Sequence, residues 1–319
     1  MRRALCVGID QYSSDPLQGC VADATRVGTV LSSHQDGTRN FDTRVLTAPI
    51  GGANGLVTRA ALRENIDDLL KDPADVALLY FSGHGTVNNL DGYLVTQDAK
   101  RYDEGVAMSD VLKWANDSKA AEVVILLDCC HSGALGNAPA IDNRKALLRE
   151  GLSILTASRA DQPSVETGGA GLFTSLLVDA LEGGAADLLG QVSAQAIYAS
   201  VEAALGAWEQ RPLFKSHVSR VLALRNCTPP IERAVLRRIP LLFPLPAEDH
   251  PLDPSFEPES QHPNPGNVAI FKELQILNRV YLVTPVGVAN MYDAAMQSTA
   301  CRLTPTGRYY WRLAKGGRI

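Results

Sequence analysis

A run of apolar residues that ends in polar, reactive side chains limits what this chain can fold into more than any other feature. The run Glu122–Asp128 (Glu-Val-Val-Ile-Leu-Leu-Asp) shows no alternation, and Cys129, Cys130 and His131 follow it directly. An unbroken apolar run of this length predicts a strand covered on both faces, as in a parallel sheet. Because ligands of open parallel sheets bind beyond the carboxyl ends of the strands, we expect the functional site there.

A second apolar run, residues 75–82, has the same character and ends in Gly83-His84-Gly85. Two neighbouring strands would therefore deliver a histidine and a thiol pair to one edge of the sheet. A thiolate attacks carbonyl carbon, and an imidazole can hold the thiol proton and deliver it to the leaving amine. The backbone amides of Gly85 and Cys130 are the expected donors to the oxyanion. This edge thus carries the groups needed for acyl transfer.

Strands alternate with helical patterns over the first 226 residues. Strands are expected at residues 3–9, 43–47, 75–82, 122–128, 152–158 and within 211–224, with helices at 17–31, 62–70, 108–116, 171–181 and 193–205. Residues 92–96 are expected to be a short extended piece near the site. The alternation predicts an α/β fold, a doubly wound, mostly parallel sheet of about six strands.

The chain changes character after residue 226. Residues 228–265 hold ten of the 18 prolines, a density that argues against regular helix and predicts a linker or strapped segment over 227–266. The apolar stretch 241–245 within it is expected to lie along a domain surface.

Residues 267–319 are expected to form a small basic module with seven Lys/Arg against two Asp/Glu. The pattern predicts helices at 268–277 and 286–297, a strand at 302–304 and a helix beginning at Pro305, which is compatible with a helical or winged-helix-like module. Tyr309, Tyr310 and Trp311 are consecutive, so at least one ring should be buried. We favour a protein sensor or adaptor as the partner of this module over nucleic acid.

Composition indicates a soluble globular protein. The net charge is −5 and 45% of the residues are hydrophobic, while no apolar run approaches the roughly 20 residues that span a bilayer. The first apolar stretch is too short for a signal peptide, so we expect a cytoplasmic protein without membrane contact. Six cysteines without zinc-ligand spacing predict reduced thiols, with Cys6 packed in the core.

Three stretches resemble the signatures of the caspase–metacaspase superfamily. They are Gly8-Ile-Asp-x-Tyr12 with Leu17-x-Gly-Cys-x-x-Asp-Ala24, Tyr80-Phe-Ser-Gly-His-Gly85, and Asp128-Cys-Cys-His-Ser-Gly133. The resemblance covers residues 1–226 and implies a cysteine endopeptidase of caspase-like fold. It identifies Cys130 as the nucleophile and His84 as its catalytic partner, and places Cys129 where metacaspases usually have serine.

The same resemblance implies how substrates are selected. It assigns Asp23, Ser82 and Asp128 to the pocket for the residue before the cut, and two carboxylates there require Arg or Lys. It requires no cofactor but leaves calcium activation open, with Asp91, Asp98 and Asp103 as the candidate carboxylates. The carboxy-terminal module is similar to effector-associated domains, which suggests a bacterial stress or anti-phage response ending in selective proteolysis or cell death.

Other interpretations stay open. The cysteines and histidines could hold a metal, Asp23 and Asp128 could cap turns, and His131 could lie at the rim of the site. The caspase-like domain could also be an inactive scaffold that only binds partners. The polar loop 134–151 predicts self-cleavage at Arg144, Lys145 or Arg149.

Overall fold

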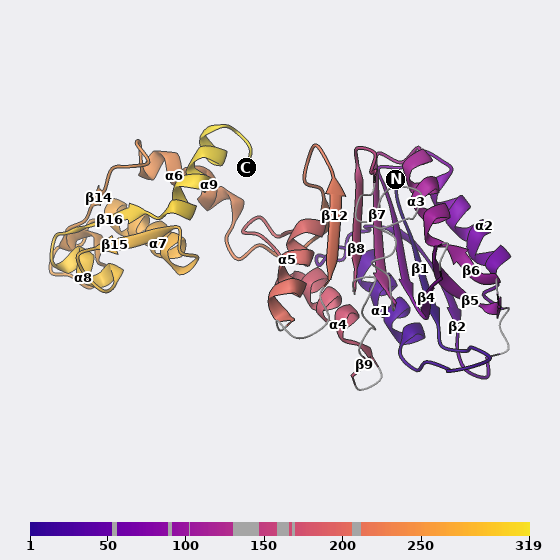
Figure 1. Cartoon of the computed structure of the whole chain (residues 1–319). Coiled ribbons are helices and arrows are strands. Elements are labelled where there is room, and N and C mark those ends of the chain that lie inside the picture. The colour runs from indigo at the N-terminus through magenta and orange to yellow at the C-terminus, as the bar shows by residue number, and fades with distance from the viewer. Residues whose placement is uncertain are drawn as a thin grey trace. The chain divides into compact units, whose positions relative to one another are not determined.

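A computed structural model describes residues 1–52, 56–88, 91–101, 103–129, 147–157, 166–167, 170–205 and 212–319. The chain divides into two compact units, Met1–Thr228 and Pro229–Ile319 (Figure 1). Among the helices within these ranges, none is long and apolar enough to cross a membrane.

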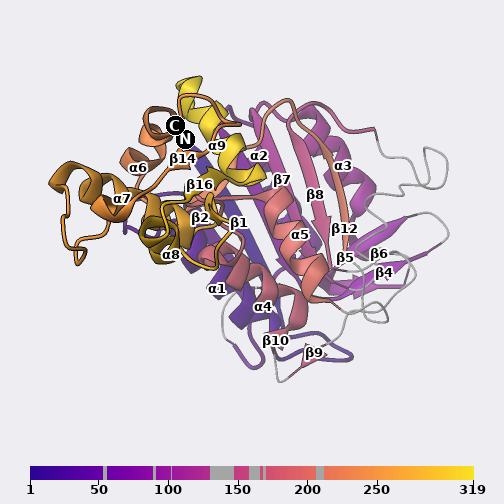
Figure 2. The ribbon, with the colours of Figure 1, turned by 90° about the vertical axis from the view of Figure 1, so that its left-hand side faces the viewer.

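The first unit is built on a six-stranded sheet with the order β12-β8-β7-β3-β1-β2. Its strands are β1 (Arg2–Ile9), β2 (Asp42–Ala48), β3 (Val76–Ser82), β7 (Glu122–Asp128), β8 (Leu152–Thr156) and β12 (Leu213–His217). The first five are parallel, and β12 runs antiparallel beside β8 (Figure 2). The prediction of a mostly parallel sheet is confirmed.

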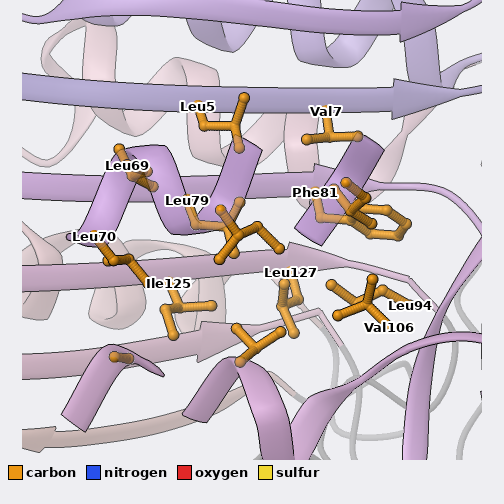
Figure 3. Close-up of a cluster of buried hydrophobic side chains, with 14 of the residues drawn as sticks. Leu5, Val7, Leu69, Leu70, Leu79, Phe81, Leu94, Val106, Ile125 and Leu127 are labelled. Carbon is orange, nitrogen blue, oxygen red and sulfur yellow. The ribbon is translucent and has the colours of Figure 1, made fainter. Parts of the chain in front are cut away.

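Helices cover both faces of this sheet and form two cores. On one face α2 (Arg59–Leu70) and α3 (Met108–Asp117) pack on alternate strand residues such as Leu79 and Ile125 (Figure 3). On the other face lie α1 (Cys20–Ser32), α4 (Leu172–Asp179) and α5 (Ala194–Ala204), around Tyr80 and Leu126. β3 and β7 are therefore buried on both faces, which is why their sequences lack alternation.

The first unit also contains several short strands outside the six-stranded sheet. β4 (Gly85–Val87), β5 (Gly92–Lys100) and β6 (Asp103–Ala107) form an antiparallel sheet directly after β3. The remaining short elements are the pairs β9 (Glu166–Thr167) with β10 (Ala170–Gly171) and β11 (Gln191–Ser193) with β13 (Ala223–Asn226), and a π-helical turn, Ala180–Gly184, after α4. The extended piece predicted at 92–96 is the first half of β5.

The second unit combines helices with a three-stranded antiparallel sheet of order β14-β16-β15. Its elements are α6 (Arg233–Leu242), β14 (His250–Pro251), a 3-10 turn Pro254–Phe256, α7 (Pro265–Arg279), β15 (Val283–Val286), α8 (Met291–Met296), β16 (Ala300–Leu303) and α9 (Pro305–Lys315). Tyr310 is buried, as predicted for one ring of the aromatic triplet, and Pro305 begins its helix.

Two predictions for this region are wrong. The proline-rich segment contains a helix, α6, whose apolar face buries Leu236, Ile239 and Leu242. Pro240 lies near its end, where one lost backbone hydrogen bond is offset by this burial. The helix predicted from residue 286 begins only at Met291, because residues 283–286 pair with β16 and Asn290 caps the new helix at Asp293 N.

Candidate active site

His84 lies between β3 and β4, at the carboxyl edge of the sheet. Its Nε2 is 2.6 Å from the carbonyl oxygen of Asp15. Because a carbonyl oxygen only accepts hydrogen bonds, this contact places the ring proton on Nε2 and leaves Nδ1 as the nitrogen that can receive a proton. Asp15 has a left-handed backbone, with φ of 54°, which turns its carbonyl toward the ring.

Tyr12 holds the other side of His84. The Tyr12 hydroxyl accepts a hydrogen bond from the His84 amide at 3.0 Å, and the two ring centroids are 4.6 Å apart. Burial raises the pKa of the Tyr12 phenol, so it stays neutral. Gly83 makes room for it, because a Cβ at Gly83 would lie 2.5 Å from the hydroxyl. The glycine before His84 therefore serves the placement of the imidazole.

A cavity of about 420 Å³ opens beside His84. Its lining comes from residues 12–15, from the start of β4, from β5 and from the beginning of β6, and includes Asp15, Lys100 and Glu104. The short antiparallel sheet after β3 thus forms one wall of the space next to the imidazole.

The residue expected to be the nucleophile, Cys130, and its neighbour His131 lie outside the described residues, as do Arg144 and Lys145. Cys129 is described and is fully buried in the core that α2 and α3 cover. Cys6 is also buried, and its burial raises the pKa of the thiol to about 12. Both cysteine side chains therefore pack in the hydrophobic core of the first unit.

The three residues expected to select the substrate come together from three elements. Ser82 ends β3 and pairs in register with Asp128, which ends β7. Asp23 lies in the first turn of α1. The Gly171 amide donates to Asp23 Oδ2 at 2.9 Å, and a Cβ on Gly171 would lie 2.3 Å from Asp128 Oδ2. Both carboxylates therefore meet at Gly171.

These residues are buried, with 1% of Asp23, 2% of Ser82 and 7% of Asp128 exposed. Asp23 accepts the amide of Gly171, the residue before α4, and does not cap its own helix. The amino-terminal amides of α1 at Cys20 and Val21 bond to Asp10 Oδ1 instead. Asp23 and Asp128 are thus a convergent carboxylate pair at low exposure, with Arg26 4.0 Å from Asp23 Oδ1 and with Thr174 donating to Asp128. Burial of two carboxylates has a desolvation cost that such partners must offset.

A buried hydrogen-bond chain that sequence reasoning missed supports Asp128. Thr174 Oγ1 donates to Asp128 Oδ2 at 2.6 Å, and the Tyr80 hydroxyl lies 2.6 Å from the same Thr174 oxygen. Burial, and then the charges of Asp128 and Asp23, raise the pKa of Tyr80 well above its usual range. Thr174 was hidden within an apolar helical pattern, where a hydroxyl carries no signal of its own.

Arg149 differs from its expected role as an exposed cleavage site. Its guanidinium donates to the carbonyl oxygens of Ala115, Ala120 and Glu150, and its amide donates to Asn116. Burial lowers the pKa of this guanidinium. In the folded chain Arg149 anchors the segment before β8 to the end of α3, which argues against cleavage there.

The three carboxylates considered for calcium do not form one cluster. Asp91 accepts from Ser109 and from the Gly92 amide, whereas Asp98 and Asp103 both contact Arg59. Among the described residues, no group of three or more His, Cys, Asp and Glu side chains is arranged to hold a metal ion.

A mixed sheet of mostly parallel strands, with His84 just after β3 and Asp128 at the end of β7, defines a caspase-like α/β protein. Residues 1–223 match the caspase domain family, and the chain belongs to this family. The match ends close to the boundary of the first unit.

Curated relatives include two metacaspases. Metacaspase-3 of Trypanosoma cruzi (strain CL Brener) is 28% identical over 154 residues, which cover 43% of this chain and 42% of the relative. Metacaspase-1 of Saccharomyces cerevisiae (strain ATCC 204508 / S288c) is 27% identical over 172 residues, 47% of this chain and 37% of the relative. The matched region is thus about two fifths of the length of these relatives.

A solved structure of a Geobacter sulfurreducens protein superposes with a TM-score of 0.50 at 17% identity. The alignment covers 68% of this chain and 94% of that protein. At this identity the likeness concerns the fold alone.

Proposed function

We propose that this chain is a cysteine endopeptidase in which Cys130 is the nucleophile and His84 the general acid and base. The observation that carries the proposal is the contact between His84 Nε2 and the Asp15 carbonyl. It leaves Nδ1 to take the thiol proton of Cys130 during attack and to return it to the leaving amine. The amides of Gly85 and Cys130 would stabilise the oxyanion.

We further propose that the enzyme cleaves after Arg or Lys. Asp23 and Asp128 converge on Gly171, with Ser82 in register beside Asp128. A guanidinium or ammonium would compensate two weakly hydrated carboxylates, whereas an acidic side chain would be repelled.

Fluorogenic peptides test both statements together. Among peptides that differ only in the residue before the cut, those with Arg or Lys should have a far higher kcat/KM than the one with Asp. Cys130→Ala should abolish all hydrolysis. Circular dichroism would show that the variant is folded. Faster cleavage after Asp would overturn the pocket assignment, and hydrolysis that survives Cys130→Ala would overturn the nucleophile.

Self-processing at Arg144 or Lys145 belongs to the same proposal, because those residues are of the type the pocket would accept. Mass spectrometry of activated wild type and Cys130→Ala would detect it as cleavage in the wild type only. An intact wild-type chain would remove self-processing.

The second unit is proposed to recruit the peptidase to a protein sensor or adaptor in the cytoplasm, in a bacterial stress or anti-phage response. Its support is its compactness, since residues 229–319 form a unit of their own. Deleting this unit should leave residues 1–228 folded and change basal activity or recruitment. If Cys130 resists every active-site probe while partner binding persists, the alternative of an inactive scaffold holds instead.

A further inference from the structure

The start of α4 contacts both members of the acid pair. Gly171 precedes this helix and Thr174 lies in its first turn, and each donates one hydrogen bond to a different carboxylate, Gly171 to Asp23 and Thr174 to Asp128. We propose that Thr174 and Gly171 are positioning residues that set the preference of the pocket for a cation. The inference deepens the proposed cleavage after Arg or Lys and rests on it.

The direction of the hydrogen bonds follows from the chemistry of the groups. An ionised Asp128 only accepts, so the single proton of the Thr174 hydroxyl points to Oδ2. The Tyr80 hydroxyl must then donate to Thr174 Oγ1. The chain Tyr80 to Thr174 to Asp128 therefore delivers a short, charge-assisted hydrogen bond to one carboxylate oxygen, and both hydroxyl residues are 0% exposed.

Neutral donors suit a pocket that must attract a cation. A buried arginine in place of Thr174 would orient Asp128 as well, but it would also cancel its charge. The Thr174 hydroxyl and the Gly171 amide orient Asp128 and Asp23 without adding a charge of their own, while the half-exposed guanidinium of Arg26 lies 4.0 Å from the other oxygen of Asp23. The selectivity for a charged over a neutral side chain should therefore depend on these two donors.

Gly171 adds a steric limit. A methyl group there would lie 2.3 Å from Asp128 Oδ2 and 3.2 Å from Asp23 Oδ2. Its φ of −64° and ψ of 127° are open to any L-residue, so an alanine would meet no backbone strain. The three atoms nearest to such a methyl group all belong to the two carboxylates, so Gly171→Ala perturbs the pair directly.

The test compares two peptides that are identical except for Arg or its neutral isostere citrulline before the cut. Thr174→Val removes the donor at nearly constant volume. We expect kcat/KM for the Arg peptide to fall about 10- to 100-fold, mainly through KM, while that for the citrulline peptide stays within about threefold. Thr174→Ser restores the hydroxyl and should recover the Arg preference.

Two further sets of variants serve as controls for effects on folding. The double variant Tyr80→Phe/Thr174→Val leaves no buried tyrosine hydroxyl without its acceptor, and its Arg-to-citrulline ratio should match that of Thr174→Val. Gly171→Ala should lower the same ratio, whereas Gly266→Ala should not, since a Cβ at Gly266 would meet only Asn264 Oδ1 at 3.2 Å.

The outcomes separate this inference from the proposed function. If the parent enzyme prefers Arg and Thr174→Val and Gly171→Ala keep that preference, the positioning role is overturned and the Arg/Lys pocket stands. An equal loss on both peptides would make Thr174 a merely structural residue and also overturn the inference. A parent enzyme without preference for Arg over citrulline would overturn the pocket and the inference together.

Discussion

The two units of this chain differ in what they bury. The first unit buries many polar side chains, among them Asp10, Asp23, Ser82, Asp128 and Thr174. In the second unit, all of whose residues are described, Thr304 is the only buried polar side chain, and it caps α9. Both units have apolar cores, yet only the first retains buried carboxylates next to strand ends.

This difference indicates where chemistry is expected. Burying a carboxylate costs free energy unless it is paired, so such groups persist where a function uses them or a network satisfies them. In the first unit Asp128 lies at the carboxyl end of β7, and Asp23 and Asp128 both approach Gly171. The polar side chains of the second unit mostly cap helices or lie in solvent, which suits a surface role.

The largest expected effect separates two histidines with similar contacts. His84→Ala should lower kcat/KM about 10³- to 10⁴-fold, because proton transfer to and from the thiol is lost, with little change in stability. His250 in the second unit also bonds a carbonyl, that of Leu242, through Nδ1. His250→Ala should reduce the stability of the second unit and leave kcat/KM unchanged. Steady-state kinetics and thermal unfolding of both variants provide the comparison, and equal activity losses would contradict it.

Next in size is the loss of a carboxylate. Asp128→Asn and Asp23→Asn should each cost about 10²-fold in kcat/KM on an Arg substrate, since a desolvated partner of the cation is removed. The matched control is Asp249→Asn, which breaks an exposed ion pair with Arg302 at 2.9 Å. That change should cost less than about 1 kcal/mol of stability and no activity. Activity on Arg that survives both first-unit substitutions would remove the carboxylates from substrate recognition.

Backbone strain offers a smaller effect. Asp15→Val should cost about 1–2 kcal/mol of unfolding free energy, because a β-branched residue opposes the positive φ, and about tenfold in kcat/KM through a displaced His84. Asp15→Gly keeps the conformation accessible and should stay near the parent. Tyr281 in the second unit has a similar φ of 59°, so Tyr281→Val should lower stability alone. Denaturant unfolding with parallel kinetics would reveal any departure, and full activity of Asp15→Val would separate the Asp15 carbonyl from catalysis.

The smallest effect is expected at Thr304. Its hydroxyl accepts from the Gly307 amide at 3.0 Å and lies 2.8 Å from the Tyr281 carbonyl. Thr304→Val should cost about 1 kcal/mol of stability and no activity, in contrast to Thr174→Val. Activity loss in Thr304→Val at a temperature where the chain is folded would mean that the second unit takes part in catalysis.

Much of the first unit follows from hydrophobic patterning. Unbroken apolar runs predicted β3 and β7 as buried parallel strands, and their polar ends led to His84, whereas the roles of Ser82 and Asp128 came from the resemblance to caspases and metacaspases. The short strands β9, β10 and β11 were not predicted, because two or three residues carry no periodicity. The antiparallel direction of β12 was also hidden, since a short strand reads the same in both directions.

The supporting residues of the site were missed for a different reason. Asp15 lies in the polar stretch Ser13-Ser14-Asp15, which indicates only a turn, and it acts through its carbonyl, which every residue has. Thr174 reaches Asp128 across 46 positions of sequence. Such contacts depend on tertiary packing, and no local pattern encodes them. In the second unit the high proline density led to the wrong prediction that no regular helix forms, because burial of one apolar face stabilises α6 despite Pro240.

Active-site labelling tests the central claim most directly. The full chain is treated with a peptide chloromethylketone that carries Arg, and the modified residue is mapped by mass spectrometry. We predict a single adduct on Cys130 that is absent in His84→Ala, slowed in Asp128→Asn and unchanged in His250→Ala. A folded, activated chain that leaves Cys130 unlabelled, or that reacts equally in His84→Ala, would contradict a peptidase site at this edge of the sheet.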